Sequence, residues 1–189
     1  MNIEQIRDAL PDYARDLKLN LGTVLTTNGA PGLNEKQIWS IALASAIAAR
    51  NTSFARSVEA ESRAHLADLD IEGAKAAAAI MGMNNIYYRF LHLVEDGEYQ
   101  TMPARLRMNV IGNHGIDKLD FELISLAVSA VNGCGLCVTS HEKKLRSHDV
   151  SREAIQSAVR IAATIHAVAG VLEFEKSQPV AAGAAELAA

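Results

Sequence analysis

Aromatic residues, prolines and cysteines are scarce in this sequence. Aromatic side chains make up 5% of its 189 residues, four residues are proline and two are cysteine, whereas hydrophobic residues make up 49%. Two cysteines cannot supply the dense disulfide framework of a small secreted domain. Much of the apolar share is alanine, which favours packed helices over sheets. Patterns typical of β-strands are almost absent, so we expect an all-α fold.

Long apolar runs and concentrated positive charge are also lacking. No apolar run comes near the ~20 residues that span a bilayer, and the polar start of the chain does not resemble a signal sequence. The net charge is −4 and the basic residues are scattered, which argues against a nucleic-acid-binding face. We therefore expect a cytoplasmic protein with neither a membrane nor a nucleic-acid partner.

Helical periodicity runs through nearly the whole chain. Near the amino terminus, apolar residues recur at helical spacing, with Pro11 as an expected kink. Asn34 and Gln37 form a predicted capping box, and Asp117 and Ser151 are predicted helix caps. Helices are predicted over about 35–50, 53–66, 71–84, 84–94, 117–132, 135–147 and 152–174, with mostly loop and one helical turn over 95–116.

We expect one domain over residues 1–175, followed by a small-residue, flexible tail over 176–189. Within the domain, residues 39–51 (WSIALASAIAARN) align without gaps with residues 121–133 (FELISLAVSAVNG), at an offset of 82. This similarity predicts two related helical halves, and chance similarity between two alanine-rich helices is the alternative. The alignment puts Thr52, Ala55 and Glu59 opposite Cys134, Cys137 and His141, so the first half carries none of the reactive groups.

Polar residues form a single stripe along the otherwise apolar helix predicted over 117–132. Glu122, Ser125, Ser129 and Asn132 recur at helical spacing. A helix that is apolar on nearly every face is expected to be buried. The stripe is then either a solvated strip on a half-exposed helix or the wall of a polar pocket, where the partly buried Glu122 carboxylate can act as a base.

Sulfur-containing and aromatic side chains gather between residues 81 and 90. We expect them to pack in a core or a subunit interface, and a wall of the functional site is the alternative. The residues are Met81, Met83, Tyr87, Tyr88 and Phe90.

Both cysteines and one histidine fall on one face of a predicted helix. Gly133 is expected to end one helix and to begin the next, which puts Cys134 in a first turn, where free N–H groups and the helix dipole favour a thiolate. Cys134, Cys137 and His141 are spaced three and four residues apart. The two thiols are therefore within disulfide reach, and the imidazole lies one turn beyond.

Three kinds of site fit this pattern. A structural disulfide that closes so short a loop would contribute only about 2 kcal/mol. A zinc site would use Cys134, Cys137 and His141 with Glu122 or water, but structural zinc sites usually have a second Cys or His pair, which is missing. A redox-active dithiol served by a base is the interpretation we favour, with no metal and no bound cofactor. Glu122 lies eleven residues before Gly133 and His141 eight after it, so the two side chains lie at similar depth if the helices fold back at this glycine. Carboxylate, imidazole and thiol then form a proton relay.

The spacing of Glu122, Cys134, Cys137 and His141 resembles that of the alkylhydroperoxidase branch of the carboxymuconolactone decarboxylase-like superfamily. The segments RMNVIGNHGI, FELISLAVSAVNGC, MGMNN and IEQIRDALPDYARDLKLNL also resemble segments of its members. The resemblance implies an all-helical homotrimer that reduces organic hydroperoxides in the response to oxidative stress. It further implies that electrons come from dihydrolipoamide on a 2-oxo acid dehydrogenase acyltransferase, and that they can pass to a partner peroxiredoxin.

Carried over by position, the resemblance implies a role for each site residue. Cys137 would attack the peroxide, Cys134 would close the disulfide, and Glu122 would act through His141 and a water. Cys134 would then face the thiol reductant and Cys137 the peroxide pocket. Leu136 stands where members often carry a shuttle histidine, so proton transfer between the thiols must use water or be slower.

Two other functions stay open at this point. The absence of the shuttle histidine motivates a thiol–disulfide redox adaptor without peroxide turnover of its own. The shared scaffold motivates a lyase of the decarboxylase branch, although that chemistry does not need a dithiol.

Overall fold

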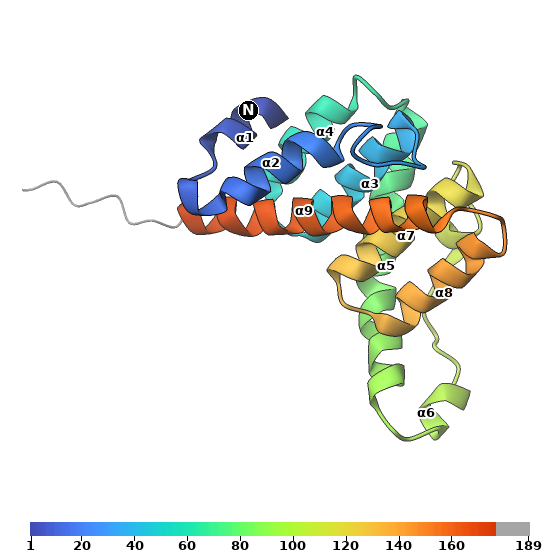
Figure 1. Cartoon of the computed structure of the whole chain (residues 1–189). Coiled ribbons are helices and arrows are strands. Elements are labelled where there is room, and N and C mark those ends of the chain that lie inside the picture. Colours follow the sequence, from blue (N-terminus) through green and yellow to red (C-terminus); the bar gives the residue numbers. More distant parts are fainter. Residues whose placement is uncertain (177–189) are drawn as a thin grey trace, which may run out of the picture.

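Helices account for all the regular structure of residues 1–176, the part of the chain that this computed structural model describes (Figure 1). The predicted all-α fold is confirmed. Apart from Lys176, the tail that we expect to be flexible lies outside the described residues. The α-helices are α1 (Ile3–Ala9), α2 (Arg15–Val24), α3 (Glu35–Ala48), α4 (Thr52–Ser62), α5 (Asp68–Leu93), α6 (Glu98–Thr101), α7 (Lys118–Val131), α8 (Gly135–Arg146) and α9 (Arg152–Lys176), and two short 3₁₀ helices span Asp12–Ala14 and Asn109–Ile111.

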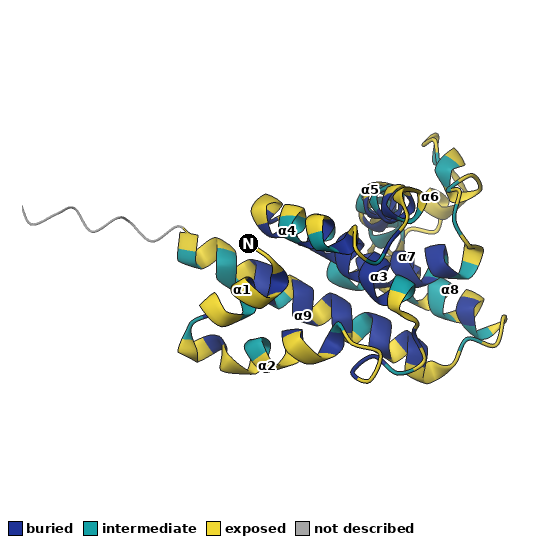
Figure 2. Ribbon diagram, turned by 90° about the horizontal axis from the view of Figure 1, so that it is seen from above, coloured by how far each residue is buried: buried dark blue, intermediate teal, exposed yellow. Residues whose placement is uncertain are grey.

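Helices α3 and α7 form the centre of the fold. They pack against each other, and each also packs against α5 and α9. Every residue over 38–46 of α3 is buried, and α7 is buried over 120–129 except at Glu122 (Figure 2). The apolar composition of both helices on nearly every face accounts for this position. Glu122 is thus the one residue over 120–129 of the chain that is not buried.

A buried carboxylate joins the two central helices. Asp120 of α7 accepts a hydrogen bond from Gln37 Nε2 at 2.7 Å, and its other oxygen lies 2.6 Å from Lys36 Nζ. The hydrogen bond with Asp120 raises the pKa of Lys36 above its usual value. Gln37 also completes the predicted capping box with Asn34 at the start of α3, so that capping and tertiary contact use the same side chain.

The helix bounds reproduce the internal repeat. When the bounds of α3, α4 and α5 are shifted by 82 residues, each falls within two residues of the corresponding bound of α7, α8 and α9. The two central helices are therefore the two copies of the first helix of the repeat. This arrangement agrees with the predicted pair of related halves.

The predicted helices near Pro11 and near residue 84 differ from those in the structure. Pro11 separates α1 from a 3₁₀ turn rather than kinking one helix, because proline lacks an N–H and the residue before it, Leu10, takes an extended conformation (ψ 136°). The two helices predicted to meet at residue 84 are a single helix, α5. Residues 95–116 contain two short helical turns instead of one.

Helices α5 and α9 flank the central pair and are the longest in the fold. By length and composition alone α9 could cross a membrane, contrary to the expectation that no stretch would, but 50% of its apolar window is buried within the fold. It packs against α2, α3 and α7, which explains its apolar face. The carboxyl-terminal half of α5 extends beyond the body of the fold and forms a projecting arm with α6 (Figure 1).

Candidate redox site

A tight turn between α7 and α8 carries the first cysteine. Gly133 has a φ of +69°, a conformation that costs other residues roughly 1–2 kcal/mol, so the turn requires glycine. Cys134 is the N-cap of α8, one position before the first turn in which we expect it. Its Sγ accepts a hydrogen bond from the Cys137 N–H at 3.3 Å. The cap therefore offers a sulfur at this position both a hydrogen-bond donor and the positive end of a helix dipole.

The two cysteines form a disulfide, and their Cα atoms are 5.3 Å apart. Their surroundings differ. Cys134 is completely buried, whereas Cys137 is 7% exposed and lines a cavity. The expectation that Cys134 faces a thiol reductant therefore does not hold in this oxidised structure, because Cys134 has no exposed surface.

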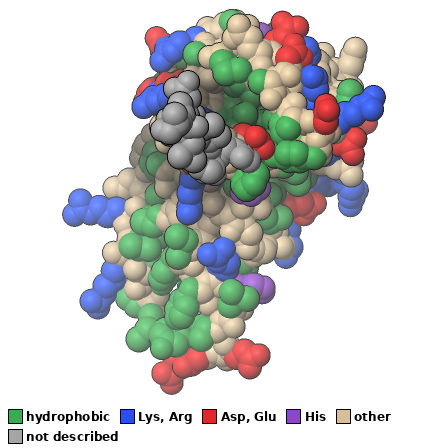
Figure 3. All heavy atoms as spheres, turned by 90° about the vertical axis from the view of Figure 1, so that its left-hand side faces the viewer, with side chains coloured by type: hydrophobic (Ala, Val, Ile, Leu, Met, Phe, Trp, Pro, Cys, Tyr) green, Lys and Arg blue, Asp and Glu red, His purple; other side chains and the backbone are tan. Residues whose placement is uncertain are grey.

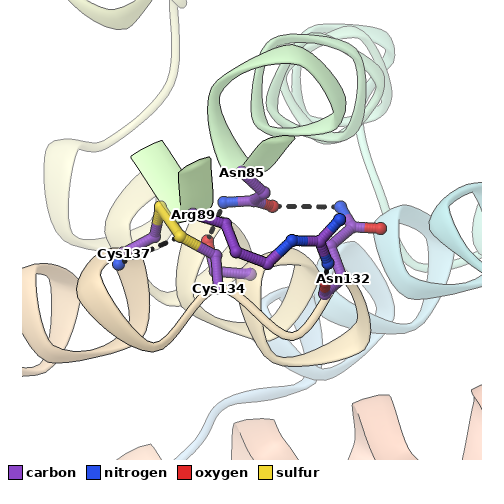
Figure 4. The surroundings of a disulfide bond; sticks show 6 residues. Asn85, Arg89, Asn132, Cys134 and Cys137 are labelled. Atoms are coloured by element: carbon purple, nitrogen blue, oxygen red, sulfur yellow. Dashed lines mark hydrogen bonds between the residues drawn. A yellow bond between two sulfur atoms is a disulfide. The ribbon is translucent and has the colours of Figure 1, made fainter. Parts of the chain in front are cut away.

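Helix α5 holds the cysteine-bearing turn from the side (Figure 4). Asn85 Nδ2 donates to Ser129 Oγ at 2.8 Å, and Asn85 Oδ1 accepts from Asn132 Nδ2 at 3.0 Å. Arg89, one turn further along α5, donates to the backbone carbonyl of Asn132 at 2.7 Å. These bonds satisfy polar groups at the end of α7 and fix where α8 begins.

Glu122 and His141 meet across the α7–α8 hairpin. Glu122 Oε2 lies 2.7 Å from His141 Nδ1, and the side chains are 23% and 15% exposed. Because the carboxylate can only accept, Nδ1 carries the proton in this pair, and Nε2 is left free to accept or return one. The carboxylate and the imidazole thus lie at similar depth, as counting residues from Gly133 predicts.

A cavity of about 420 Å³ brings these groups together. Cys137, His141 and Glu122 border it, and most of the remaining wall is apolar. Met81 and Tyr88 of α5 belong to that wall, so for these two residues the alternative interpretation as a site wall is correct. The other lining residues are Asn84, Met108, Ile111, Phe121, Leu136 and Ser140.

The polar stripe of α7 is not a solvated strip. Ser125 and Ser129 are completely buried, and Ser129 is bonded to Asn85. Of the four stripe residues, Glu122 alone borders the cavity. The stripe therefore consists of one residue that borders the cavity, Glu122, the buried Ser125, and two residues that bond to Asn85 of α5, Ser129 and Asn132. The sequence pattern along α7 does not distinguish these roles.

The hydrogen-bonding residues that α5 contributes to the site and its turn, Asn84, Asn85 and Arg89, are absent from the sequence-based set. A signal for them exists, since two adjacent asparagines in the interior of an alanine-rich helix are unfavourable unless their amides are used. Within the described chain, no set of three or more His, Cys, Asp or Glu side chains is arranged to hold a metal ion.

The first half of the fold contains a second cavity, of about 330 Å³, beside α4, the helix that the repeat relates to α8. Thr52, Ala55 and Glu59 line it where the other half has Cys134, Cys137 and His141. Glu59 accepts from Arg56 at 2.8 Å and pairs with Lys75 at 2.7 Å, and these bonds lower the pKa of Glu59. Among the residues that the structure describes, the lining of this cavity contains neither a thiol nor an imidazole, so we assign the redox chemistry to the second half.

The fold and the site define an all-helical protein with a thiol–disulfide centre next to a carboxylate–imidazole pair. Residues 97–174 match the Carboxymuconolactone decarboxylase family. The chain is 55% identical over 175 residues to "Alkyl hydroperoxide reductase AhpD" of Rhodospirillum centenum, covering 93% of this chain and 92% of that protein. It is 56% identical to the protein of the same name from Gluconacetobacter diazotrophicus (92% and 93%) and 51% identical to that of Streptomyces coelicolor (93% and 97%). The chain belongs to the carboxymuconolactone decarboxylase family, and within it to the AhpD proteins.

Proposed function

We propose that the protein is a thiol-dependent alkyl hydroperoxide reductase that cycles through the Cys134–Cys137 disulfide. The observation that carries the proposal is the shared cavity, in which the accessible sulfur of the disulfide lies beside a bonded carboxylate–imidazole pair. The relatives named alkyl hydroperoxide reductase support the same reaction class. The mostly apolar wall suits the organic group of a hydroperoxide better than it suits hydrogen peroxide.

The proposed oxidation has two steps. The Cys137 thiolate attacks the terminal oxygen of the hydroperoxide, the O–O bond breaks, and the alkoxide takes a proton to leave as the alcohol. Cys134 then attacks the sulfenic acid of Cys137, which releases water and forms the disulfide. His141 supplies and recovers protons through Nε2, and Glu122 holds the imidazole through Nδ1.

The reduction needs a dithiol from outside the chain. We propose a dihydrolipoyl group on an acyltransferase as the donor and a peroxiredoxin as a further electron acceptor, as the family resemblance implies. Exchange with a small dithiol is compatible with a cavity of about 420 Å³ that reaches Cys137. A dithiol that must be reduced again suits a reducing compartment, so we also propose a cytoplasmic location, which cell fractionation tests.

A homotrimer is part of the proposal, and the projecting arm supports it. Ile86, Phe90 and Leu93 follow one another at helical spacing on α5 and are 57%, 46% and 71% exposed. Figure 3 shows hydrophobic side chains gathered over this projecting arm. Exposed apolar patches of this kind mark association surfaces. Sedimentation equilibrium tests the assembly, and a monomer at micromolar concentration would contradict it.

A direct experiment tests the central reaction. The reduced protein is mixed with one equivalent of cumene hydroperoxide, and the disulfide and the alcohol are followed by mass spectrometry. We expect one alcohol per disulfide formed, continued turnover with dihydrolipoamide, and loss of turnover in Cys137→Ser. Unchanged turnover in that variant would refute the assignment.

The presence of Leu136 in place of a shuttle histidine favours a second candidate, the redox adaptor. An adaptor would form the Cys134–Cys137 disulfide with diamide or with a disulfide-bearing partner but not with the hydroperoxide. The same mixing experiment, run with diamide in parallel, distinguishes the two functions.

A further inference from the structure

Asn84 is a buried polar residue in the cavity wall for which the described chain offers no partner. The residue is 4% exposed, and it lines the same cavity as Cys137 and His141. Its Oδ1 is buried and has no hydrogen-bond partner among residues 1–176. The neighbouring Asn85 is buried too, but its amide is used by Ser129 and Asn132. Of the two adjacent amides, one therefore bonds to the end of α7, and the other belongs to a residue that borders the cavity and has a carbonyl oxygen without a donor in the described chain.

The position is unfavourable for a merely structural asparagine. Asparagine is a poor helix former, and a buried carbonyl oxygen without a donor destabilises the fold. The wall beside it consists largely of apolar groups, including Met81, Tyr88 and Phe121. Ligand sites typically combine such an apolar wall with a few polar groups that orient the ligand.

We propose that the Asn84 carboxamide binds the peroxide group of the substrate and orients it for attack by Cys137, an inference that rests on the proposed function. A carboxamide offers one acceptor oxygen and an N–H₂ donor, and a hydroperoxide offers one O–H donor and two acceptor oxygens. Oδ1 accepts the O–H of the terminal oxygen, and Nδ2 donates to the oxygen that bears the organic group.

This arrangement stabilises the charge that the reaction develops. When the thiolate bonds to the terminal oxygen, the O–O bond breaks and its electron pair goes to the other oxygen, the one that accepts from Nδ2. That hydrogen bond strengthens as the alkoxide forms, until the alkoxide takes a proton from His141. The O–H proton stays on the terminal oxygen, which becomes the sulfenic acid of Cys137, so atoms and electrons balance.

The test compares Asn84→Leu and Asn84→Ala with the wild-type protein, with Ser125→Ala as a control that removes another buried polar atom without a partner among the described residues, at a residue outside the cavity lining. Disulfide formation is timed once with stoichiometric cumene hydroperoxide and once with diamide, which oxidises thiols without an O–O bond. We expect Asn84→Leu to slow the hydroperoxide reaction by at least about tenfold and to leave the diamide reaction within about twofold. We expect Asn84→Ala, which removes the amide without adding a charge, to be slowed with hydroperoxide as well, and Ser125→Ala to match the wild type.

Each result is decisive. Equal slowing with both oxidants would show that Asn84 acts on the thiol or on the fold, and a wild-type rate with hydroperoxide in Asn84→Leu would show that it does not act at all. Both overturn the inference while the proposed function stands. If Asn84→Leu does not fold, Asn84→Ala carries the same comparison. Failure of the wild-type protein to react with hydroperoxide would instead overturn the proposed function itself.

Discussion

Replacing Glu122 by glutamine isolates the charge of the carboxylate from its shape. In the wild-type structure, His141 Nδ1 lies 2.7 Å from Glu122 Oε2. The glutamine amide fits the same space and keeps an acceptor oxygen for Nδ1, but it removes the negative partner of a protonated imidazole. A hydrogen bond to a charged group contributes about 1.5–3 kcal/mol and a neutral one about 0.5–1.5 kcal/mol. The difference is about 1–1.5 kcal/mol, and the partial exposure of both side chains keeps it near the lower end through solvent screening.

About 1.4 kcal/mol corresponds to a tenfold change in rate. At about 1 kcal/mol, the lower end of the range, we therefore expect Glu122→Gln to form the Cys134–Cys137 disulfide about fivefold more slowly than the wild type when mixed with hydroperoxide at pH 7. Part of the loss should be recovered near pH 9, because a free thiol, with a pKa of about 8.5, then ionises without help.

The measurement is single-turnover disulfide formation, with circular dichroism as the check on folding. Glu142→Gln is the matched control, because it removes one negative charge beside His141 without touching the 2.7 Å pair. A folded Glu122→Gln protein that reacts at the wild-type rate at pH 7 would remove Glu122 from the site.

Two further substitutions test other parts of the argument. Leu136→His places an imidazole at a position that is 41% exposed beside the cavity. We expect severalfold faster disulfide formation at neutral pH in stopped-flow mixing. An unchanged rate would mean that water already carries the proton between the two thiols. Glu59→Gln tests the first half of the fold. Hydrogen bonds with Lys75 and Arg56 hold the pKa of Glu59 below its usual 4.5. The contribution of these bonds to stability is therefore present above pH 4.5 and is lost as the pH falls through the lowered pKa. We expect Glu59→Gln to lower the free energy of unfolding in urea by about 1–3 kcal/mol at pH 7 and by less in acid, where Glu59 of the wild type is protonated. A loss of stability in acid equal to the loss at pH 7 would contradict this account.

Local pattern was enough to predict most of the fold and the core of the site. Helix periodicity and caps such as Asn34 and Asp117 depend on residues within one turn, so the sequence carries them directly. Glu122 and His141 could be paired because both lie on helices that leave the same glycine turn, which makes their depth a matter of counting residues. The site residues of α5 could not be found in this way, since they reach the site through packing between helices that are distant in sequence.

The difference between the cysteines also escaped prediction. The helix start explains why Cys134 occupies a favourable place for a thiolate, but its complete burial depends on the surrounding helices and not on the spacing of the motif. Similarly, periodicity alone predicts a break near Asn84 and Asn85, where the structure continues α5 without interruption. There the cost of two asparagines in a helix is offset in part by the bonds that Asn85 makes with α7.

The complete burial of Cys134 gives the disulfide one accessible end. Any thiol that opens the bond has to attack Cys137, and Cys134 is then expelled as a thiolate into the N-cap position that suits it. In the proposed cycle, oxidant and reductant would therefore both react at Cys137, and neither could react while the other occupies the cavity. Such an arrangement would produce ping-pong kinetics, in which an excess of either reactant blocks the reaction of the other, and the size of the cavity would limit which thiols can reduce the protein.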